Sequence, residues 1–182
     1  MKKLVIIPTY KEKENIQLIV DAVFNLGQQY HLLIIDDNSP DGTADIVKSM
    51  QQLHPQELFL VERAGKLGLG TAYIAGFEWA LVNGYDFIFE MDADFSHDPS
   101  DLERLYDACH TGGADMAVGS RYVSGGKIEN WPLSRKLISK AGALYSKLIT
   151  WLPVNDATAG FVCYSRKVLA TMDLKSIRFV GY

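Results

Sequence analysis

At residues 87–99 the sequence reads FIFEMDADFSHDP, an apolar run that passes directly into an acidic segment. The apolar part, 87–91, is interrupted only by Glu90 and follows an Asn-Gly turn signal, which is typical of a strand buried on both faces of a parallel sheet. Asp92 and Asp94 stand where this strand ends. Because they are two residues apart on extended chain, their side chains leave the same face and can reach one ligand.

Two carboxylates at the end of a buried strand repel each other unless a cation lies between them. Asp92 and Asp94 therefore indicate a site for a hard divalent ion that keeps some of its waters and shares its shell with substrate phosphates, namely Mg²⁺ or Mn²⁺. The competing interpretation is an acidic loop that caps a helix beginning at Pro99, with Asp98 as N-cap and Pro99 at the first helical position. Asp98 suits that role, whereas both interpretations stay open for the other two.

The rest of the chain alternates apolar runs with segments of helical periodicity. We expect strands over 4–7, 32–35, 58–61, 87–91 and 116–119, and helices over 15–26, 43–53, 70–82 and 99–110. This alternation predicts an α/β fold, with a Rossmann-like open and mostly parallel sheet and helices on both faces. Ligands of such sheets bind beyond the carboxyl ends of the strands. The polar clusters 8–12, 36–41 and 92–98 fall at those ends, together with Arg121.

The composition is that of a soluble globular protein. The 182 residues, 48% of them hydrophobic and 22% charged, fit one domain spanning 1–182, and the net charge of −4 argues against a general nucleic-acid binder. Cys109 and Cys163 lack metal-binding spacing, which predicts buried free thiols in a reducing compartment. The apolar run before Pro8, residues 4–7, is too short for the apolar core of a signal peptide. No run reaches the ~18 apolar residues of a transmembrane helix. We therefore expect a cytoplasmic protein.

Two further segments each have two interpretations. The glycine-rich stretch 65–70 lacks the Walker and dinucleotide spacings. It is either a flexible turn into the next helix or a mobile loop whose Arg63 and Lys66 reach phosphate or acceptor. Segment 133–152 carries one apolar helical stripe, basic residues off that stripe and no acidic residue. It is either a half-buried surface helix or a basic amphipathic helix lying on an anionic membrane surface.

Several motifs together resemble those of a known family. In chain order they are PTYKEKENI (8–16), IIDDNSPDGT (34–43), KLGLGTAY (66–73), MDADFSHDP (91–99), GSRY (119–122), NWP (130–132) with Arg135, and DATAGF (156–161). With them the chain resembles the polyprenyl-phosphate (dolichol-phosphate) mannose synthases, which are inverting, metal-dependent glycosyltransferases of family 2. The resemblance covers essentially the whole chain, and it implies the GT-A fold.

The resemblance also implies which residues form the site. The nucleoside pocket would be lined by Pro8, Tyr10, Glu12, Ile35 and Asp37. Asp92 and Asp94 would hold Mg²⁺ or Mn²⁺ on the donor diphosphate, and Ala93 between them would contact the donor. Asp94 and Arg121 would serve catalysis. Arg135, near the start of the basic helix, would bind the acceptor phosphate.

The implied reaction moves a mannosyl group from GDP-mannose to a polyprenyl monophosphate with inversion. It would take place at the cytoplasmic face of a membrane, to which the basic helix would attach peripherally. Three alternatives remain: a related transferase using another nucleotide sugar such as UDP-glucose or another acceptor, a non-catalytic nucleotide-sugar-binding or membrane-docking domain, and a metal-dependent nucleotidyltransferase. The family usually continues beyond the position of Tyr182 into an FQxEM stretch and a basic segment. We therefore expect this chain to lack the segment that closes over the donor.

Overall fold

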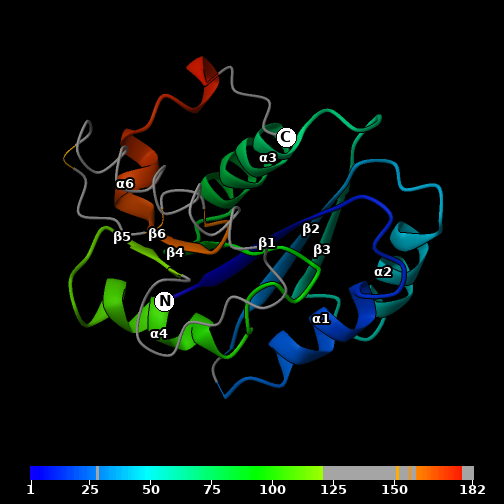
Figure 1. Cartoon of the computed structure of the whole chain (residues 1–182), viewed down its shortest axis with the longest axis horizontal. Helices are drawn as coiled ribbons and strands as arrows, with labels where there is room; N and C mark the ends of the chain where they lie inside the picture. Colours follow the sequence, from blue (N-terminus) through cyan, green and yellow to red (C-terminus); the bar gives the residue numbers. More distant parts are fainter. Residues whose placement is uncertain (28, 121–150, 152–155, 157–158, 178–182) are drawn as a thin grey trace, which may run out of the picture.

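The computed structural model describes residues 1–27, 29–120, 151, 156 and 159–177, which form a sheet covered by helices on both faces (Figure 1). The elements are β1 (Lys3–Thr9), α1 (Ile16–Phe24), β2 (His31–Asp36), α2 (Thr43–Gln51), β3 (Leu58–Glu62), α3 (Leu69–Val82), β4 (Phe87–Glu90), α4 (Asp101–His110), β5 (Met116–Val118), β6 (Val162–Ser165), α6 (Arg166–Thr171) and the 3₁₀ helix η1 (Leu174–Ser176). Within the described ranges the sheet has the order β3-β2-β1-β4-β6-β5. The predicted α/β architecture is confirmed.

The first four strands form the parallel part of the sheet. β1 pairs in parallel with β2 on one side and with β4 on the other, and β2 pairs in parallel with β3. Because side chains alternate across a strand, Val5 and Ile7 enter one core cluster, and Leu4 and Ile6 enter the cluster on the opposite face. Burial on both faces explains why these strands appear in the sequence as continuous apolar runs.

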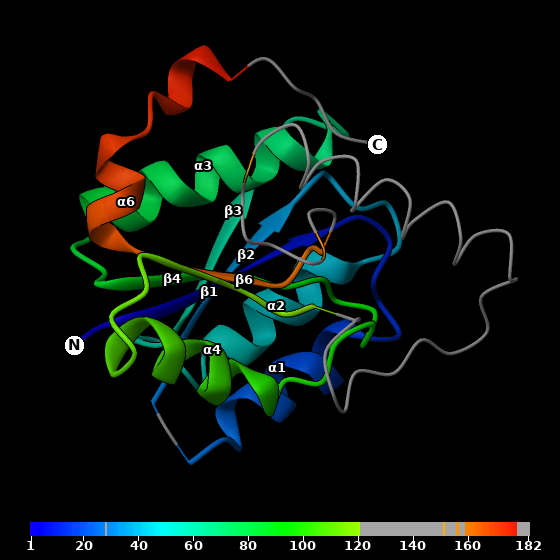
Figure 2. The same cartoon turned by 60° about the vertical axis from the view of Figure 1, so that its left-hand side comes forward.

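Two layers of helices enclose the sheet. Helices α1, α2 and α4 cover one face, and α3 with α6 covers the other (Figure 2). Helix α3 comes very close to β1 at Gly76, where an added Cβ atom would lie 2.7 Å from Cγ2 of Ile6. Any side chain at this position would push the helix away from the strand. Gly76 therefore sets how closely α3 lies on the sheet.

Strand β6 was not predicted from the sequence. It lies between β4 and β5 and runs antiparallel to both, with Cys163 opposite Phe89 on one side and Ala117 on the other. The segment is only four residues long, and its partners lie far earlier in the chain, so a rule based on alternating strands and helices has no means of placing it. The expected strand over 116–119 forms as β5, but it joins the sheet through β6. The sheet is mostly parallel, as predicted, with an antiparallel edge.

The start of α4 differs from the prediction by two residues. The helix begins at Asp101 rather than at Pro99. Oδ1 of Asp98 accepts the N–H of Ser100 (2.9 Å), and the N–H of Asp101 donates to the carbonyl of Asp98 (3.0 Å). The prediction of Asp98 as N-cap is therefore wrong, because a separate turn at Pro99 and Ser100 precedes the helix. Asp98 stabilises that turn.

Three further predictions concern burial and membranes. Cys109 and Cys163 are both free and buried, as predicted. No helix in the described part of the chain combines the length and the apolar character needed to cross a bilayer. The basic helix predicted over 133–152 lies outside the described residues except for Trp151, which is exposed.

Candidate active site

The loops that follow β1 and β2 lie against each other at the carboxyl edge of the sheet. Three backbone N–H groups of the first loop donate to side chains after β2: Lys11 to Oγ of Ser39 (3.0 Å), Glu12 to Oγ1 of Thr43 (3.1 Å) and Lys13 to Oδ2 of Asp41 (3.2 Å). The N–H of Asp37 also donates to the carbonyl of Thr9 (3.0 Å). The polar clusters 8–12 and 36–41 therefore meet, as the parallel sheet predicts.

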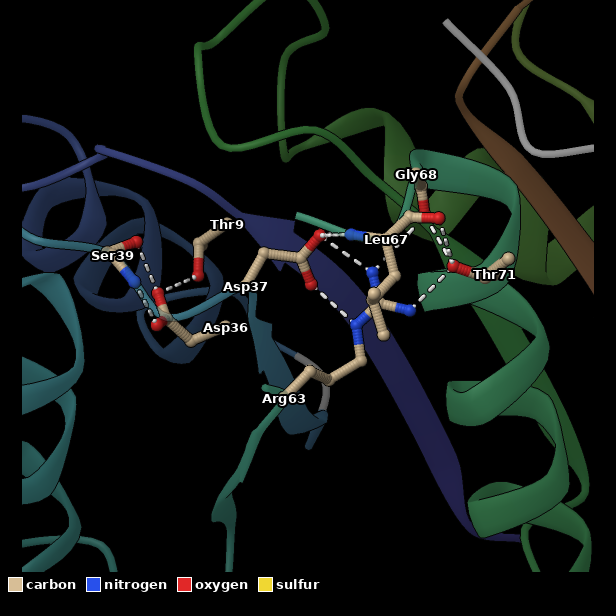
Figure 3. A network of polar contacts seen from close by, with 8 residues as sticks. All are labelled: Thr9, Asp36, Asp37, Ser39, Arg63, Leu67, Gly68 and Thr71. Atoms are coloured by element: carbon tan, nitrogen blue, oxygen red, sulfur yellow. Dashed lines mark hydrogen bonds and ion pairs between the residues drawn. The ribbon is translucent and has the colours of Figure 1, made fainter. Parts of the chain in front are cut away.

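Asp36 has a structural role in this junction (Figure 3). Its side chain is completely buried and accepts hydrogen bonds from Oγ1 of Thr9 (2.9 Å) and from the N–H and Oγ of Ser39 (2.8 and 2.6 Å). A buried carboxylate needs such donors to offset the loss of its hydration. Asp36 therefore joins the end of β2 to β1 and to its own loop.

Asp37, one residue later, forms a buried ion pair with Arg63 (Figure 3). Nε of Arg63 donates to Oδ1 of Asp37, and Nη2 donates to Oδ2 (2.7 Å). The same guanidinium group reaches Oγ1 of Thr71 (2.7 Å) and the carbonyl of Gly68 (3.2 Å), and the N–H of Leu67 donates to Oδ2 of Asp37 (3.2 Å). This two-pronged, charge-assisted contact ties the glycine-rich loop to the end of β2. One interpretation of the sequence had Arg63 reach phosphate or acceptor. In the structure its guanidinium group is instead paired with the carboxylate of Asp37.

Tyr10 lies at the same edge with 36% of its surface exposed. Nζ of Lys66 is 4.8 Å from the centre of its ring, and Nζ of Lys11 is 5.6 Å away. Both ammonium groups are within the range of cation–π attraction. The glycine-rich loop therefore touches the β1 loop through Lys66, and a cationic, partly open aromatic surface results.

Pro8 and Ile35 are two further residues expected at the nucleoside pocket. They lie opposite each other in the register of β1 and β2. Pro8 is half-buried, whereas Ile35 has no exposed surface and belongs to the core cluster beside α3. Pro8 is therefore partly accessible at this edge, whereas Ile35 supports the edge from within the core.

Asp92 and Asp94 follow β4 at this edge. Asp92 is partly buried, and its Oδ1 accepts a hydrogen bond from the hydroxyl of Tyr73 (3.2 Å). Asp94 is exposed, and its Oδ1 accepts the N–H of Ser96 (2.9 Å). Ala93 between them is buried in the core on the side of α1 and α4. The carboxylate of Asp92 therefore lies against α3, whereas that of Asp94 is exposed to solvent.

Negative charge accumulates around Asp92. Burial raises the pKa of its carboxyl group, the charge of Asp94 raises it further, the hydrogen bond from Tyr73 lowers it, and Glu12 adds a smaller increase. Glu90 lies two residues earlier, and its pKa is raised to about 7 by burial and by the charge of Asp92, against a hydrogen bond with Tyr164. A charged group that other carboxylates disfavour in this way is stabilised by a cation.

The donor set fits a hard divalent cation. The two carboxylates offer oxygen ligands, and the excess negative charge around Asp92 favours a positive ion. Within the described ranges, no group of three or more His, Cys, Asp or Glu side chains is arranged to hold a metal. A cation at Asp92 and Asp94 would therefore complete its shell with water and with oxygens of a bound ligand, as Mg²⁺ commonly does beside phosphates.

Some site residues were not found by sequence reasoning, and others lie outside the described residues. Arg121 and Arg135 belong to the second group. Tyr73 and Gly160 belong to the first: Tyr73 donates to Asp92, and an added Cβ atom on Gly160 would lie 2.9 Å from its Oδ2. Both residues occur in the motifs of the family resemblance, but nothing in their sequence spacing indicates a contact with Asp92.

The arrangement of the chain is similar to that of solved glycosyltransferases. A structure of glucosyl-3-phosphoglycerate synthase from Mycobacterium tuberculosis, in complex with Mn²⁺, UDP and glucosyl-3-phosphoglycerate, has a TM-score of 0.68 at 18% identity, over 94% of this chain and 59% of that one. A mannosyltransferase from Pyrobaculum calidifontis, in complex with GDP-Man and Mn²⁺, has a TM-score of 0.59 at 18% identity, over 93% and 46%. This chain spans less than two thirds of either protein. The fold is that of the GT-A glycosyltransferases, as predicted.

Sequence relatives narrow this class. The model of glycosyl transferase family 2 matches residues 4–172. A polyprenol monophosphomannose synthase from Mycolicibacterium smegmatis is 46% identical over 181 residues, which cover 100% of this chain and 68% of that protein. An undecaprenyl-phosphate mannosyltransferase from Micrococcus luteus is 45% identical over 182 residues, which cover 100% and 74%. The chain belongs to glycosyl transferase family 2, and the predicted resemblance to polyprenyl-phosphate mannose synthases is confirmed.

Proposed function

We propose that this glycosyltransferase moves a mannosyl group from GDP-mannose to a polyprenyl monophosphate with inversion at the anomeric carbon. The observation that carries the proposal is that the Asp92–Asp94 pair and the loops of Tyr10 and Asp37 follow neighbouring parallel strands at one edge of the sheet, where the charge of Glu12 acts on Asp92. The names of the two relatives that match the whole chain support mannose and a polyprenyl phosphate. Both relatives are at least 45% identical to it.

Asp92 and Asp94 would hold Mg²⁺ or Mn²⁺ against the donor diphosphate. When bound, the ion supplies charge neutralisation for the departing diphosphate as a Lewis acid. Asp94 is exposed at the mouth of the site, and Asp92 is fixed beside α3. The Mn²⁺ named in the two solved structures supports a divalent ion.

The acceptor needs positive charge more than it needs a general base. A phosphate monoester has a second pKa near ~6, so it is largely a dianion at pH 7 and is already a nucleophile. His31 begins β2, His54 lies in the connection between α2 and β3, and His110 ends α4. His97 stacks on Phe161 with ring centres 4.9 Å apart. Arg121 and Arg135 are suited to hold an anionic acceptor beside an anionic donor.

Arg135→Ala is predicted to weaken use of the acceptor while sparing the donor. Removing a charged hydrogen-bond donor from a phosphate costs about 1.5–3 kcal/mol, or about 10- to 150-fold in the KM for polyprenyl phosphate. The Kd of GDP should change less than twofold. Steady-state kinetics with varied acceptor and calorimetry with GDP measure the two quantities. Equal losses in both would contradict the assignment of Arg135.

Tyr10→Ala is predicted to weaken GDP binding about tenfold, because an aromatic platform under a base contributes about 1–3 kcal/mol. Tyr10→Phe keeps the ring and should bind GDP like the wild type. Tyr10 is 36% exposed at the edge of the sheet, so neither variant should alter the melting temperature appreciably. Unchanged GDP affinity in Tyr10→Ala would show that the guanine base of GDP does not stack on Tyr10.

Membrane attachment belongs to the same proposal. The basic, acid-free segment 133–152 would lie on an anionic membrane surface at its cytoplasmic face, where it would bring Arg135 to the lipid phosphate. The support is the charge pattern of the segment and the lipid acceptors named for the relatives.

A calorimetric titration of this 182-residue chain with GDP, UDP and GDP-mannose, each with and without Mn²⁺, tests the donor assignment. The proposal predicts metal-dependent binding that is selective for GDP and GDP-mannose. Selective binding of UDP would indicate another nucleotide sugar. Tight binding of a nucleoside triphosphate with release of pyrophosphate would instead indicate a nucleotidyltransferase.

A further inference from the structure

Asp92 is held from behind by a residue of α3. The hydroxyl of Tyr73 donates to Oδ1 of Asp92 at 3.2 Å, and Gly160 lies against Oδ2, where an added Cβ atom would come within 2.9 Å. One oxygen is therefore anchored, and the backbone beside the other has no side chain. The hydrogen bond from Tyr73 restricts rotation of the Asp92 side chain, and the missing side chain at Gly160 leaves room for its Oδ2.

Tyr73 is itself rigidly placed. It is only 7% exposed, its ring stacks on Phe77 with centres 6.3 Å apart, and Phe77 makes an edge-on contact with Tyr164 at 5.4 Å. A buried tyrosine places its hydroxyl where a partner satisfies it, and Asp92 is that partner.

The position of Tyr73 depends on the close approach of α3 to the sheet. Gly76 follows Tyr73 by three residues, which puts both on the same face of the helix. An added Cβ atom at Gly76 would lie 2.7 Å from Cγ2 and 2.8 Å from Cδ1 of Ile6 on β1. The absence of a side chain at Gly76 therefore lets the helix lie close enough for the tyrosine hydroxyl to reach a carboxylate at the end of β4.

We propose that Tyr73 is a positioning residue for the metal-binding carboxylate of Asp92, and that Gly76 sets its reach. The inference rests on the proposed function, because it takes Asp92 as a ligand of the divalent ion. Partners of a metal ligand that fix its orientation commonly contribute 10–100-fold to metal affinity. Because Tyr73 contributes one hydrogen bond of 3.2 Å to Asp92, we expect an effect on metal affinity at the lower end of that range.

Tyr73→Phe removes only the hydroxyl and tests this proposal. With GDP at saturation, the Kd of Mn²⁺, measured by electron paramagnetic resonance of the free ion, should rise about tenfold. The Kd of GDP measured at saturating Mn²⁺ should stay unchanged. In turnover, the Mn²⁺ concentration for half-maximal rate should rise by the same factor, and saturating Mn²⁺ should restore kcat.

Tyr85→Phe is the matched control. Tyr85 is 3% exposed, and its hydroxyl makes one hydrogen bond with Nδ1 of His31 (2.8 Å) at the opposite edge of the sheet. Both variants lose one buried hydroxyl and one hydrogen bond, so both should lower the melting temperature by a similar amount. Only Tyr73→Phe should lose Mn²⁺ affinity.

The positioning role is overturned if Tyr73→Phe binds Mn²⁺ as tightly as the wild type does. In that case the proposed function still stands, because the wild type binds the metal. An equal loss of affinity in Tyr85→Phe would also overturn it, because the effect would then be a general loss of stability. If the wild type with GDP does not bind Mn²⁺, both the positioning role and the metal site at Asp92 and Asp94 are wrong.

Discussion

Asp94→Ala should reduce mannosyl transfer about a thousandfold and leave the fold intact. A metal that neutralises the leaving diphosphate contributes several kcal/mol to the stability of the transition state, and each 1.36 kcal/mol is a factor of ten in rate. The side chain of Asp94 is exposed, and its only hydrogen bond recorded in the described part of the chain is from the N–H of Ser96. Its removal should therefore cost the fold less than about 1 kcal/mol.

Asp98→Ala is a closely matched control for this variant. Asp98 is an exposed aspartate in the same loop, and its Oδ1 accepts the N–H of Ser100 at 2.9 Å, just as Oδ1 of Asp94 accepts that of Ser96 at 2.9 Å. The two variants lose the same kind of contact and should melt within a few degrees of each other. Only Asp94→Ala should lose Mn²⁺-dependent binding of GDP. Full activity of Asp94→Ala would remove Asp94 from the metal site.

Arg63→Ala should destabilise the protein by about 3–5 kcal/mol, because it leaves the carboxylate of Asp37 buried without its partner. The two side chains are only 9% and 8% exposed. At about 2–4 °C for each kcal/mol in a chain of this size, the melting temperature should fall by about 6–20 °C. The double variant Arg63→Ala/Asp37→Ala should recover part of this loss, since no charge then remains unpaired.

The control for Arg63→Ala is an exposed ion pair. Nη1 of Arg104 lies 2.7 Å from Oδ1 of Asp101, but the side chains are 69% and 44% exposed. Such pairs contribute less than about 1 kcal/mol, so Arg104→Ala should shift the melting temperature by only a few degrees. Thermal unfolding followed by circular dichroism measures both variants. A loss in Arg63→Ala as small as that in Arg104→Ala would show that the buried pair does not hold the glycine-rich loop.

The parallel core and the acidic edge were predictable because they follow from local patterns. Continuous apolar runs mark strands buried on both faces, and the alternation with helices requires the ends of β1, β2 and β4 to meet. The Asp92–Asp94 pair could be recognised in the sequence for the same reason. It interrupts an apolar run at the position where a strand must end.

The contacts that place the site were not predictable, because they depend on packing between distant segments. Arg63 could equally have faced a phosphate, and its choice of Asp37 depends on how the glycine-rich loop turns back toward β2. Tyr73 looks like an ordinary core residue of a helix until Gly76 is seen to bring that helix close to β1. Strand β6 was missed because a four-residue segment takes its direction from neighbours that lie far earlier in the chain.

The central claim is that this protein transfers mannose from GDP-mannose to a polyprenyl monophosphate. The most direct test supplies the protein with labelled GDP-mannose, Mn²⁺ and a polyprenyl monophosphate in vesicles of anionic lipid, and then analyses the lipid fraction. The account predicts that labelled mannose enters the lipid as a mannosyl phosphate with the anomeric configuration inverted, that EDTA abolishes the transfer, and that UDP-glucose does not replace the donor. Absence of transfer from GDP-mannose, transfer from UDP-glucose instead, or a product of retained configuration would contradict it.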